Sequence, residues 1–551
     1  MPGFPRPSRI AAVPLPQIVE VAGGSRSVTI DPAGAADTSG TAVTGVTHDS
    51  TQVRPGDLYV ALRGRSRHGA EFAAQAIGAG AVAVLTDEAG AAMIRASGSA
   101  GRVPVLIVDD PRAVMGAVAA RTYGDPTADL TVVGLTGTAG KTSTAYLVES
   151  GLAAAGHTTC LIGTVETRIG ADVLDSVHTT PEATDLHALF AVARERGVTA
   201  AVMEVSSHAL TYGRVGGVHF DVGGFTNFGQ DHLDFHTDLA DYFAAKARLF
   251  DGRCRLEVLN LDDEAVRSLV RPHSITFSAS GNPAATWRAE NVTRSGFTQA
   301  FTAVHDEHGA VEVTVAMPGR HNVANALLAL ACLVAVGVPA KVAAEGIGAC
   351  RGVPGRLELV GPAGPQGSWP VLGVVDYAHK PDAIAAALAA LREVTTGRLL
   401  CVVGAGGDRD RGKRPLMGAA AARGADLVVV TDDNPRSEDP AAIRAEVLAG
   451  AAAADGARHG VIEVAGRRAA IAEAVRLAEP GDVIAVLGKG HERGQEIAGV
   501  VTPFDDRVEL AAALRERFGS PEGTSPAHTG LTGRASGEPG AGREPGAEVQ
   551  P

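Results

Sequence analysis

A glycine-rich stretch that ends in lysine and threonine offers the most specific chemistry in this chain. Residues 134–142, Gly-Leu-Thr-Gly-Thr-Ala-Gly-Lys-Thr, follow an apolar run, precede a helical pattern and fit G-x-x-x-x-G-K-[ST]. Glycines in such a loop let backbone N–H groups converge on phosphate oxygens at the start of a helix. Lys141 would then reach the β- and γ-phosphates, and the Thr142 hydroxyl would bind Mg²⁺. The residues that we expect to hold ATP here are Gly137, Thr138, Ala139, Gly140, Lys141, Thr142 and Ser143.

A phosphate loop of this kind does not by itself select one reaction. A kinase, a GTPase and an ATP-driven ligase would all fit it. The chain contains no N-K-x-D motif for guanine recognition, which counts against a GTPase.

Two further clusters contain side chains that could bind a metal ion. "AVMEVSSHAL" (201–210) contains Glu204 at a strand end, where a phosphate-loop protein needs its second Mg²⁺ ligand. "TNFGQDHLDFH" (226–236) contains His232, but together with Asp234 or His236 it lacks the closed tetrahedral set of structural zinc. We therefore interpret His232 as one arm of a Mg²⁺ site. Lys246 follows on an apolar helix, and the alternative for it is a lysine that extends its ammonium group into solvent.

The composition indicates an acidic protein of the cell interior. The chain has 551 residues and a formal net charge of −13, so we expect no general affinity for nucleic acid or for membranes. Its five cysteines are odd in number and form no C-x-x-C pair, which indicates a reducing compartment. The chain shows no signal-peptide pattern and no apolar run of about 20 residues. We therefore expect a cytoplasmic protein.

The elements that must position these clusters are apolar runs that alternate with Ala-rich helical stretches. The predicted strands are residues 81–87, 103–110, 130–137, 200–207, 397–407, 426–433 and 482–490. Because these strands are apolar throughout, they indicate sheets that helices cover on both faces, hence an α/β fold. Ligands of such sheets bind beyond the carboxyl ends of the strands, which is where nearly all the polar motifs lie.

Composition also suggests how the chain divides. Residues 1–25 and 519–551 are rich in Pro, Gly and Ser, and we predict that both are disordered tails. Boundaries near residues 128 and 353 would leave an N-terminal domain (26–128), a central domain (129–352) and a C-terminal domain (353–518).

Ten short motifs occur along the chain in a characteristic order. They are "GTAGKT", "HTTPEA", "EVSSHAL", "FTNFGQDHLDFH", "YFAAKARLF", "GRHNVANALLALA", "VDYAHKPDA", "GAGGDRDRGKRPLM", "TDDNPR" and "GKGHE". Together they resemble the Mur ligases of peptidoglycan synthesis, and more narrowly the branch that adds 2,6-diaminopimelate to UDP-N-acetylmuramoyl-L-alanyl-D-glutamate. The resemblance runs from about residue 45 to residue 517. It implies a three-domain Mur ligase architecture: an N-terminal domain for the UDP-substrate, a central P-loop ATPase-like parallel sheet for ATP, and a Rossmann-like C-terminal domain for the amino acid.

The resemblance implies amide formation in two steps. ATP phosphorylates a substrate carboxylate, and the amine of meso-2,6-diaminopimelate then attacks the acyl phosphate. Lys141, Lys246 and His232 are the implied catalytic residues, and the sequence identifies no base for the amine. Lys246 matches a lysine that is carbamylated in the family, so that Thr142, Glu204, His232 and carbamylated Lys246 would bind Mg²⁺. Only six of the 49 Lys and Arg residues are lysines, and five of the six lie in motifs. This distribution fits a need for amine chemistry, although a composition bias is the alternative.

The matching positions also predict the substrate contacts. For ATP they add Asn322, Asn325, Arg356 and Asp376, with helix capping as the alternative for the two asparagines. For UDP-MurNAc-L-Ala-D-Glu they are His48, Ser50, Arg65, Ser66, Arg67, His178, Thr179, Thr180, Ser206, Tyr212 and Arg214. The role of Tyr212 is open, because some relatives have an amide side chain there. For diaminopimelate they are Arg409, Asp433, Asn434, Pro435, Arg436, Gly488 and Glu492.

The choice of amino acid depends on "DNPR" (433–436). Arg436 could grip the far carboxylate of diaminopimelate with two hydrogen bonds, and Asp433 or Glu492 could pair with its ammonium group. Lysine-adding relatives lack this arginine, so its presence favours diaminopimelate, whereas the meso or LL isomer stays open. The alternatives are a lysine-adding ligase, a folylpolyglutamate synthetase and a P-loop switch or scaffold protein. We expect a monomer.

Overall fold

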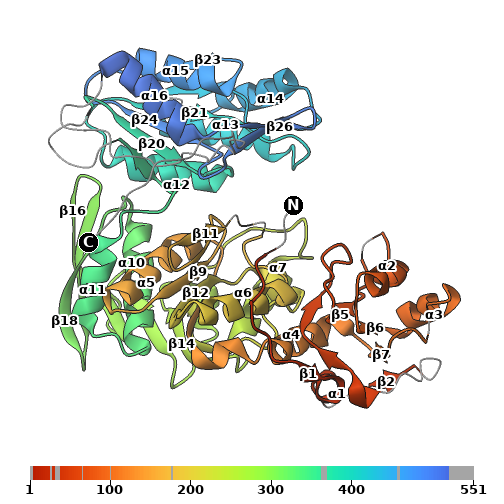
Figure 1. Ribbon diagram of the computed structural model, residues 1–551. Coiled ribbons are helices and arrows are strands. Elements are labelled where there is room, and N and C mark those ends of the chain that lie inside the picture. The colour runs from red at the N-terminus through yellow and green to blue at the C-terminus, as the bar shows by residue number, and fades with distance from the viewer. Residues whose placement is uncertain are drawn as a thin grey trace, which may run out of the picture.

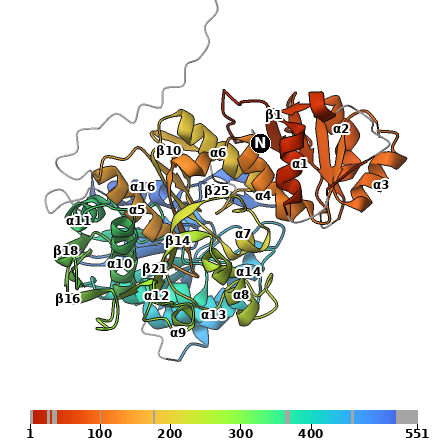
Figure 2. The same cartoon turned by 90° about the horizontal axis from the view of Figure 1, so that it is seen from below.

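The computed structural model describes residues 4–24, 28–31, 38–64, 66–99, 101–174, 176, 178–361, 369–455 and 460–519. Three large sheets with their covering helices form three lobes, which we call the first, central and third lobes in chain order (Figure 1). The third lobe faces one edge of the central lobe, and the first lobe projects from the side of the central lobe (Figure 2). The α/β class predicted from the sequence is confirmed.

The first lobe contains a five-stranded sheet in the order β2-β7-β6-β5-β4, parallel except at β2. Its strands are β1 (Val13–Pro14), β2 (Thr29–Ile30), β3 (Ala42–Val43), β4 (Gly45–Thr47), β5 (Asp57–Val60), β6 (Ala83–Thr86) and β7 (Val105–Ile107). Its helices are α1 (Leu15–Gly23), η1 (Thr38–Gly40), η2 (Gly69–Phe72), α2 (Ala73–Gly78), α3 (Glu88–Ala96), α4 (Pro111–Thr122) and η3 (Pro126–Asp129).

The prediction of a disordered segment over residues 1–25 is wrong for its described part. Leu15, Ile18 and Ala22 form one apolar face of α1 and are buried against the first lobe, where α1 packs on α4. This i, i+3, i+7 spacing is the signal of an amphipathic helix, which the average composition of the segment concealed. Phe4 packs against the central lobe instead. Residues 1–3, 25 and 520–551 of the two predicted tails lie outside the described residues.

The central lobe contains an eleven-stranded sheet in the order β11-β10-β9-β12-β8-β13-β14-β15-β16-β17-β18. Its strands are β8 (Thr131–Thr136), β9 (Thr159–Ile162), β10 (Thr167–Ile169), β11 (Asp172–Leu174), β12 (Ala200–Glu204), β13 (Phe220–Phe225), β14 (Cys254–Asn260), β15 (Ile275–Ser278), β16 (Trp287–Ser295), β17 (Thr298–His305) and β18 (Gly309–Val315). Its helices are α5 (Lys141–Ala154), α6 (Ala183–Glu195), α7 (Ser207–Thr211), α8 (Leu239–Ala247), η4 (Arg248–Phe250), α9 (Glu264–Arg267), α10 (Arg320–Ala335) and α11 (Ala340–Ala349). In the order of the sheet, the strands from β9 through β12, β8, β13, β14 and β15 to β16 are parallel. Antiparallel strands extend the sheet at both edges.

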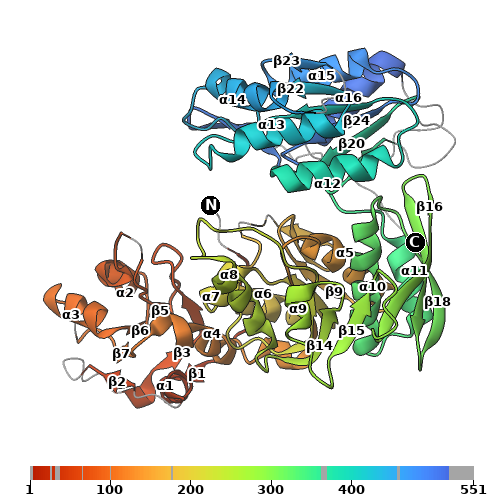
Figure 3. The same ribbon diagram turned by 180° about the vertical axis from the view of Figure 1, so that it is seen from behind.

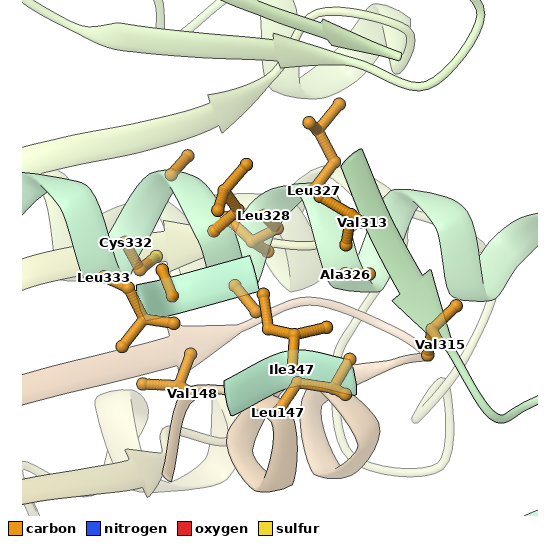
Figure 4. Packing of buried hydrophobic residues seen from close by; sticks show 14 of the residues in the cluster. Leu147, Val148, Val313, Val315, Ala326, Leu327, Leu328, Cys332, Leu333 and Ile347 are labelled. Carbon is orange, nitrogen blue, oxygen red and sulfur yellow. The ribbon is translucent and has the colours of Figure 1, made fainter. Parts of the chain in front are cut away.

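Helices cover both faces of the parallel part of this sheet. Val133 and Leu135 of β8 point into a core formed with α5, α10 and α11, whereas Val132 points into the opposite core with α6. Figure 4 shows the first of these cores, where side chains of α10 pack together with those of α5, α11 and β18. Within the described residues, no helix combines the length and the apolar character needed to cross a membrane.

The third lobe contains a six-stranded sheet in the order β19-β20-β24-β21-β22-β23, parallel except at β19. Its strands are β19 (Glu358–Val360), β20 (Leu372–Asp376), β21 (Leu399–Val403), β22 (Leu427–Val430), β23 (Val461–Glu463), β24 (Val483–Leu487) and the hairpin β25 (Gly494–Ile497) and β26 (Val500–Pro503). Its helices are α12 (Pro381–Arg392), α13 (Lys413–Gly424), α14 (Pro440–Ala452), α15 (Arg467–Leu477) and α16 (Asp506–Phe518). Helix α12 lies on the side that faces the central lobe (Figure 3).

Candidate active site

The phosphate loop joins β8 to α5, as its sequence predicts. Gly137 and Gly140 have φ angles of 142° and 83°, a backbone region that side chains disfavour. A Cβ atom at Gly137 would also collide with the Thr226 hydroxyl, and one at Gly140 would collide with the Asn325 amide oxygen. The two glycines are therefore required both by the turn and by its close neighbours.

Two lysines converge on this loop. Lys141 Nζ donates to the carbonyl oxygens of Gly137 at 2.7 Å and Thr138 at 3.1 Å, and Lys246 Nζ donates to the same Gly137 oxygen at 2.7 Å. Burial lowers the pKa of both lysines, and the neighbouring Lys141 charge lowers that of Lys246 further. Lys246 is 1% exposed, so the structure contradicts the alternative of a solvent-reaching surface lysine.

Glu204 and Thr142 form an oxygen-rich pair beside the loop. The parallel pairing of β12 with β8 places Glu204 opposite Leu135, next to the start of the loop. Glu204 is buried, and one of its oxygens accepts from the Thr142 hydroxyl at 3.1 Å while the other accepts from Thr164 N at 2.8 Å. A hydroxyl and a carboxylate are ligands that Mg²⁺ accepts, so this donor set fits the ion. Among the described residues, no three His, Cys, Asp or Glu side chains lie close enough together to hold a metal ion by themselves.

His232 lies between this centre and the third lobe. Its Nε2 is 3.5 Å from Asp231 Oδ2, and its ring contacts His208 edge-on with centroids 4.9 Å apart. Burial, with the charges of Lys380 and Lys141, lowers the pKa of His232 to about 4 despite Asp231. Its imidazole is therefore neutral at pH 7 and able to donate a lone pair.

Asn227 occupies part of the loop that the motif assigns to phosphate. The N–H groups of Thr138 and Ala139 donate to the backbone and side-chain oxygens of Asn227, at 2.8 and 3.0 Å. An anion would therefore rely on the N–H groups at the start of α5, from Gly140 to Ser143, or displace Asn227. Asn227 was not among the predicted site residues.

Asn322 and Asn325 of α10 pack against the phosphate loop, so helix capping is not their only role. Asn325 Nδ2 donates to Asn322 Oδ1 at 2.9 Å, and Asn322 Nδ2 donates to Pro318 O at 2.8 Å. Both are buried, and the Asn325 oxygen is the one that closes on Gly140. Their packing supports the loop, while a direct contact to nucleotide stays a prediction.

A second group of predicted residues assembles beyond β12. Thr180 Oγ1 donates to Glu204 O at 2.9 Å and accepts from Ser206 N at 3.2 Å, and Arg214 donates to Thr180 O at 3.1 Å. His178, which is exposed, and Thr179 belong to the same loop, and Thr179 contacts Thr164 at 3.0 Å. This group borders the Glu204 centre.

The junction with the first lobe is built on Glu182. Its carboxylate forms ion pairs with Arg214 at 2.9 Å and with Arg112 of α4 at 3.1 Å. Both guanidinium groups lie over the Tyr212 ring. Across the same junction, His48 Nδ1 lies 2.9 Å from Thr184 Oγ1. The structure therefore brings Tyr212 and Arg214 to the lobe boundary, and it adds Arg112 and Glu182, which sequence reasoning missed.

The remaining first-lobe predictions gather less closely. Ser50 contacts the Tyr59 hydroxyl, which donates to Gly69 O at 2.9 Å at the start of η2, shortly after Ser66 and Arg67. Arg67 itself is exposed and paired with Glu71 at 2.8 Å. Arg65 lies outside the described residues.

The "DNPR" loop of the third lobe is held by its neighbours. Arg436 has a φ of 52°, exchanges backbone hydrogen bonds with Glu496 and Ala498 of the β25–β26 hairpin, and donates from Nη1 to Gly407 O at 2.7 Å. Pro435 O packs on Gly407, and a Cβ at Gly406 would contact both Arg436 and Arg409. Asp433 faces Gly488, and Asn434 donates to Glu492 at 2.9 Å. All seven predicted residues thus lie in one region.

The third-lobe face with this loop is turned toward the phosphate loop. Besides burial, the positive charges of Arg356 and Lys380 lower the pKa of Lys141. Lys380 also pairs with Asp231 of the central lobe. Arg356 stacks on Tyr377, and Asp376 holds the backbone of Leu357 and Ala378 at 2.7 and 2.8 Å. Lys380 and Asp231 lie in quoted motifs but were not predicted as site residues.

Comparisons with known proteins agree with this arrangement. Residues 42–123 match the Mur ligase family catalytic domain, residues 135–333 the Mur ligase middle domain, and residues 355–490 the Mur ligase glutamate ligase domain. A Streptomyces avermitilis protein named UDP-N-acetylmuramoyl-L-alanyl-D-glutamate–2,6-diaminopimelate ligase is 52% identical over 94% of this chain and 99% of its own length. A Corynebacterium glutamicum protein of the same name is 47% identical over 87% of this chain and 93% of its own. A solved structure of an enzyme with that name has a TM-score of 0.64 at 32% identity, covering 88% of this chain and 97% of that one. This chain belongs to the Mur ligase family.

Proposed function

We propose that this protein is an ATP-dependent ligase that joins 2,6-diaminopimelate to the D-glutamate of UDP-N-acetylmuramoyl-L-alanyl-D-glutamate. One observation carries the proposal: the central lobe, with its phosphate loop and Thr142–Glu204 pair, contacts through the Lys380–Asp231 pair a third lobe in which the "DNPR" loop is bound to Glu492 through Asn434. Relatives that are 52% and 47% identical over most of the chain have this activity in their names. In this role the protein would act in the cytoplasm, as a monomer, on small-molecule substrates.

The first half-reaction needs a carboxylate to approach a triphosphate despite their like charges. Lys141 and the N–H groups at the start of α5 would bind the ATP phosphates, with Lys141 leaving the Gly137 and Thr138 carbonyls that it holds here. Mg²⁺ held by Thr142 and Glu204 would supply further charge screening. The substrate carboxylate attacks the γ-phosphorus, ADP leaves, and an acyl phosphate forms.

The second half-reaction replaces phosphate with an amine. The uncharged amino group attacks the acyl carbon, the tetrahedral intermediate expels inorganic phosphate, and the amide nitrogen loses a proton. Neutral His232, near Lys141 and on the side of the third lobe, would be an additional ligand or hydrogen-bond partner at this centre. Arg436 would hold the far carboxylate of the diamino acid and Glu492 its ammonium group.

Lys246 is the proposed site of carbamylation. Reaction of a lysine with CO₂ requires the neutral amine, because its lone pair forms the N–C bond and its proton is released. Burial and the Lys141 charge lower the pKa of Lys246, and the described residues place no carboxylate in an ion pair with it. A carbamate would convert a repelling cation near Lys141 into an attracting anion.

Phosphate release separates this function from the alternatives. The protein is incubated with ATP, Mg²⁺, UDP-MurNAc-L-Ala-D-Glu and one amino acid at a time. We expect release that depends on the dipeptide and on diaminopimelate, with separate arms for the meso and LL isomers. Release with lysine but not diaminopimelate would identify a lysine-adding ligase, release with a folate and glutamate would identify a folylpolyglutamate synthetase, and release with no acceptor would favour a switch.

A further inference from the structure

Lys489 is a fully buried lysine on the third lobe. It lies between Gly488 and Gly490, whose φ angles of 120° and 55° turn its side chain into the protein, and its exposed fraction is 0%. Burying an ammonium group is costly unless charged and polar partners compensate for the lost water. Its partners therefore indicate what the charge is for.

The Lys489 ammonium group binds two residues of the predicted amino-acid site. Nζ donates to Asn434 Oδ1 at 2.9 Å and to Glu492 Oε2 at 2.9 Å. Asn434 Nδ2 donates to the same Glu492 oxygen at 2.9 Å. The three side chains thus form a closed triangle of hydrogen bonds.

This triangle leaves Asn434 little capacity for a ligand. Its Oδ1 also accepts from Glu496 N at 3.0 Å, so both lone pairs of that oxygen are used, and the residue is 8% exposed. The Lys489 ammonium group and the Glu496 N–H can only donate hydrogen bonds, so the atom of the Asn434 amide that faces them must be its oxygen. Only one amide hydrogen of Asn434 is left.

Glu492 is fixed at one oxygen and open at the other. Its Oε2 receives Lys489 and Asn434 from inside, whereas Oε1 makes no hydrogen bond to the described residues and the side chain is 33% exposed. A carboxylate held in this way presents a defined acceptor to an ammonium group, with its rotation removed before the ligand arrives.

We propose that Lys489 is a positioning residue for the diamino acid: it holds Glu492 in one orientation, with Asn434 as the link, so that Glu492 Oε1 receives the ammonium group at the far end of the ligand. Arg436 on the same loop receives the carboxylate next to that ammonium group. Asn434 acts mainly through Glu492, and only one of its amide hydrogens is left for the ligand contact that its motif predicts. The inference rests on the proposed function and specifies how the amino acid is recognised.

The first test compares Lys489→Met with Lys341→Met, a matched change of an exposed lysine on α11. We expect Lys489→Met to raise the KM for diaminopimelate about 10- to 100-fold, the range of a lost charged hydrogen bond, while the KM values for ATP and for the UDP-dipeptide stay within about twofold. A folded variant with an unchanged KM, or with equal losses for all three substrates, would overturn the proposal.

The second test asks whether Lys489 and Asn434 act through Glu492. In a Glu492→Gln background, Lys489→Met and Asn434→Ala should each add less than about twofold to the KM for diaminopimelate, since residues that act as a unit are not additive. If Lys489→Met does not fold, Asn434→Ala decides alone: a loss that multiplies with that of Glu492→Gln overturns the proposal. A wild-type protein without diaminopimelate-dependent phosphate release would defeat the proposed function, whereas an active wild type with an unaffected Lys489→Met defeats only this inference.

Discussion

Two fully buried lysines in different lobes have opposite surroundings. Lys489 of the third lobe has a carboxylate partner at 2.9 Å and an amide oxygen at 2.9 Å. Lys246 of the central lobe, 1% exposed, donates to one backbone carbonyl and has the cation of Lys141 as its neighbour. One buried amine has a carboxylate partner, whereas the other has only the Gly137 carbonyl and the face of the Tyr242 ring, 4.6 Å away.

The difference separates two uses of the same side chain. A paired ammonium group is a fixed charge, suited to orienting Glu492 and unsuited to chemistry. An unpaired amine in a dry site loses its proton easily and becomes a nucleophile, which is the form that reacts with CO₂. The central lobe therefore contains the reactive lysine and the third lobe the structural one, and the following experiments test that division.

The largest effect is expected for Lys246→Ala. Losing a carbamate ligand beside the phosphate loop should lower kcat by about 10³-fold, the range seen when a preorganised electrostatic group is removed from an active site. Lys246→Arg should lose as much, because arginine keeps the charge and cannot be carbamylated. Steady-state phosphate release measures both, and intact mass shows whether the wild type carries one added CO₂. Full activity of Lys246→Arg would break the comparison.

His187 extends the comparison to a buried base outside both sites. It is 0% exposed, donates from Nε2 to Gly216 O at 2.9 Å, and has no partner for Nδ1 among the described residues. Burial lowers its pKa to about 4 from an ordinary value of 6.5. Because the unfolded chain takes up this proton first, the folded state loses stability as pH falls from about 6.5 to about 4, by up to about 3 kcal/mol.

Denaturant unfolding at pH 7.5 and pH 5 measures this loss. His187→Gln should flatten the dependence of unfolding free energy on pH, whereas the change His273→Gln at an exposed position should leave it unchanged. Parallel curves for wild type and His187→Gln would show that proton uptake at His187 does not contribute.

The sequence predicted seven strands from continuous apolar runs, although the equally buried strand β9 was not predicted. All seven predicted strands are present, from β6 to β24, because burial on both faces demands unbroken apolar stretches. The antiparallel strands β16–β18 were not predicted. In β17 the buried residues Gln299, Phe301 and Ala303 alternate with partly buried ones, so a search for apolar runs does not detect this strand.

A site residue could be predicted where its own sequence motif shows what it does. The loop glycines, Lys141, Glu204 and the "DNPR" residues lie at strand ends that a motif identifies. Asn227, Arg112 and Glu182 were missed because their roles arise from contacts between distant segments or lobes. Lys489 stood out in the sequence only as one of the few lysines. Its bond to Asn434 joins positions 55 residues apart, and the sequence does not show that Asn434 also binds Glu492.

Arg436→Ala tests the ligand side of the third lobe, where Lys489 supplies only the support. We expect the KM for diaminopimelate to rise about 30-fold, corresponding to about 2 kcal/mol for a charge-assisted hydrogen bond, with kcat changed less. Arg436→Lys should recover little, because an ammonium group cannot form the two-pronged contact. Arg423→Ala on the exposed face of α13 is the control. An equal rise in the KM for ATP would place Arg436 outside amino-acid recognition.

The smallest effect is expected at Lys380, a lysine intermediate between the two buried ones. It pairs with Asp231 across the lobe boundary while its side chain is 37% exposed. Burial alone would raise the pKa of Asp231, but the hydrogen bond and charge of Lys380 outweigh it and hold that pKa below its usual range. Since a partly exposed pair contributes at most about 1 kcal/mol, Lys380→Gln should lower kcat/KM for ATP by no more than about fivefold. Added salt should reduce the difference between wild type and variant, because the pair is screened. A loss as large as that of Lys246→Ala, and insensitive to salt, would instead place Lys380 among the groups that contact the reacting phosphates.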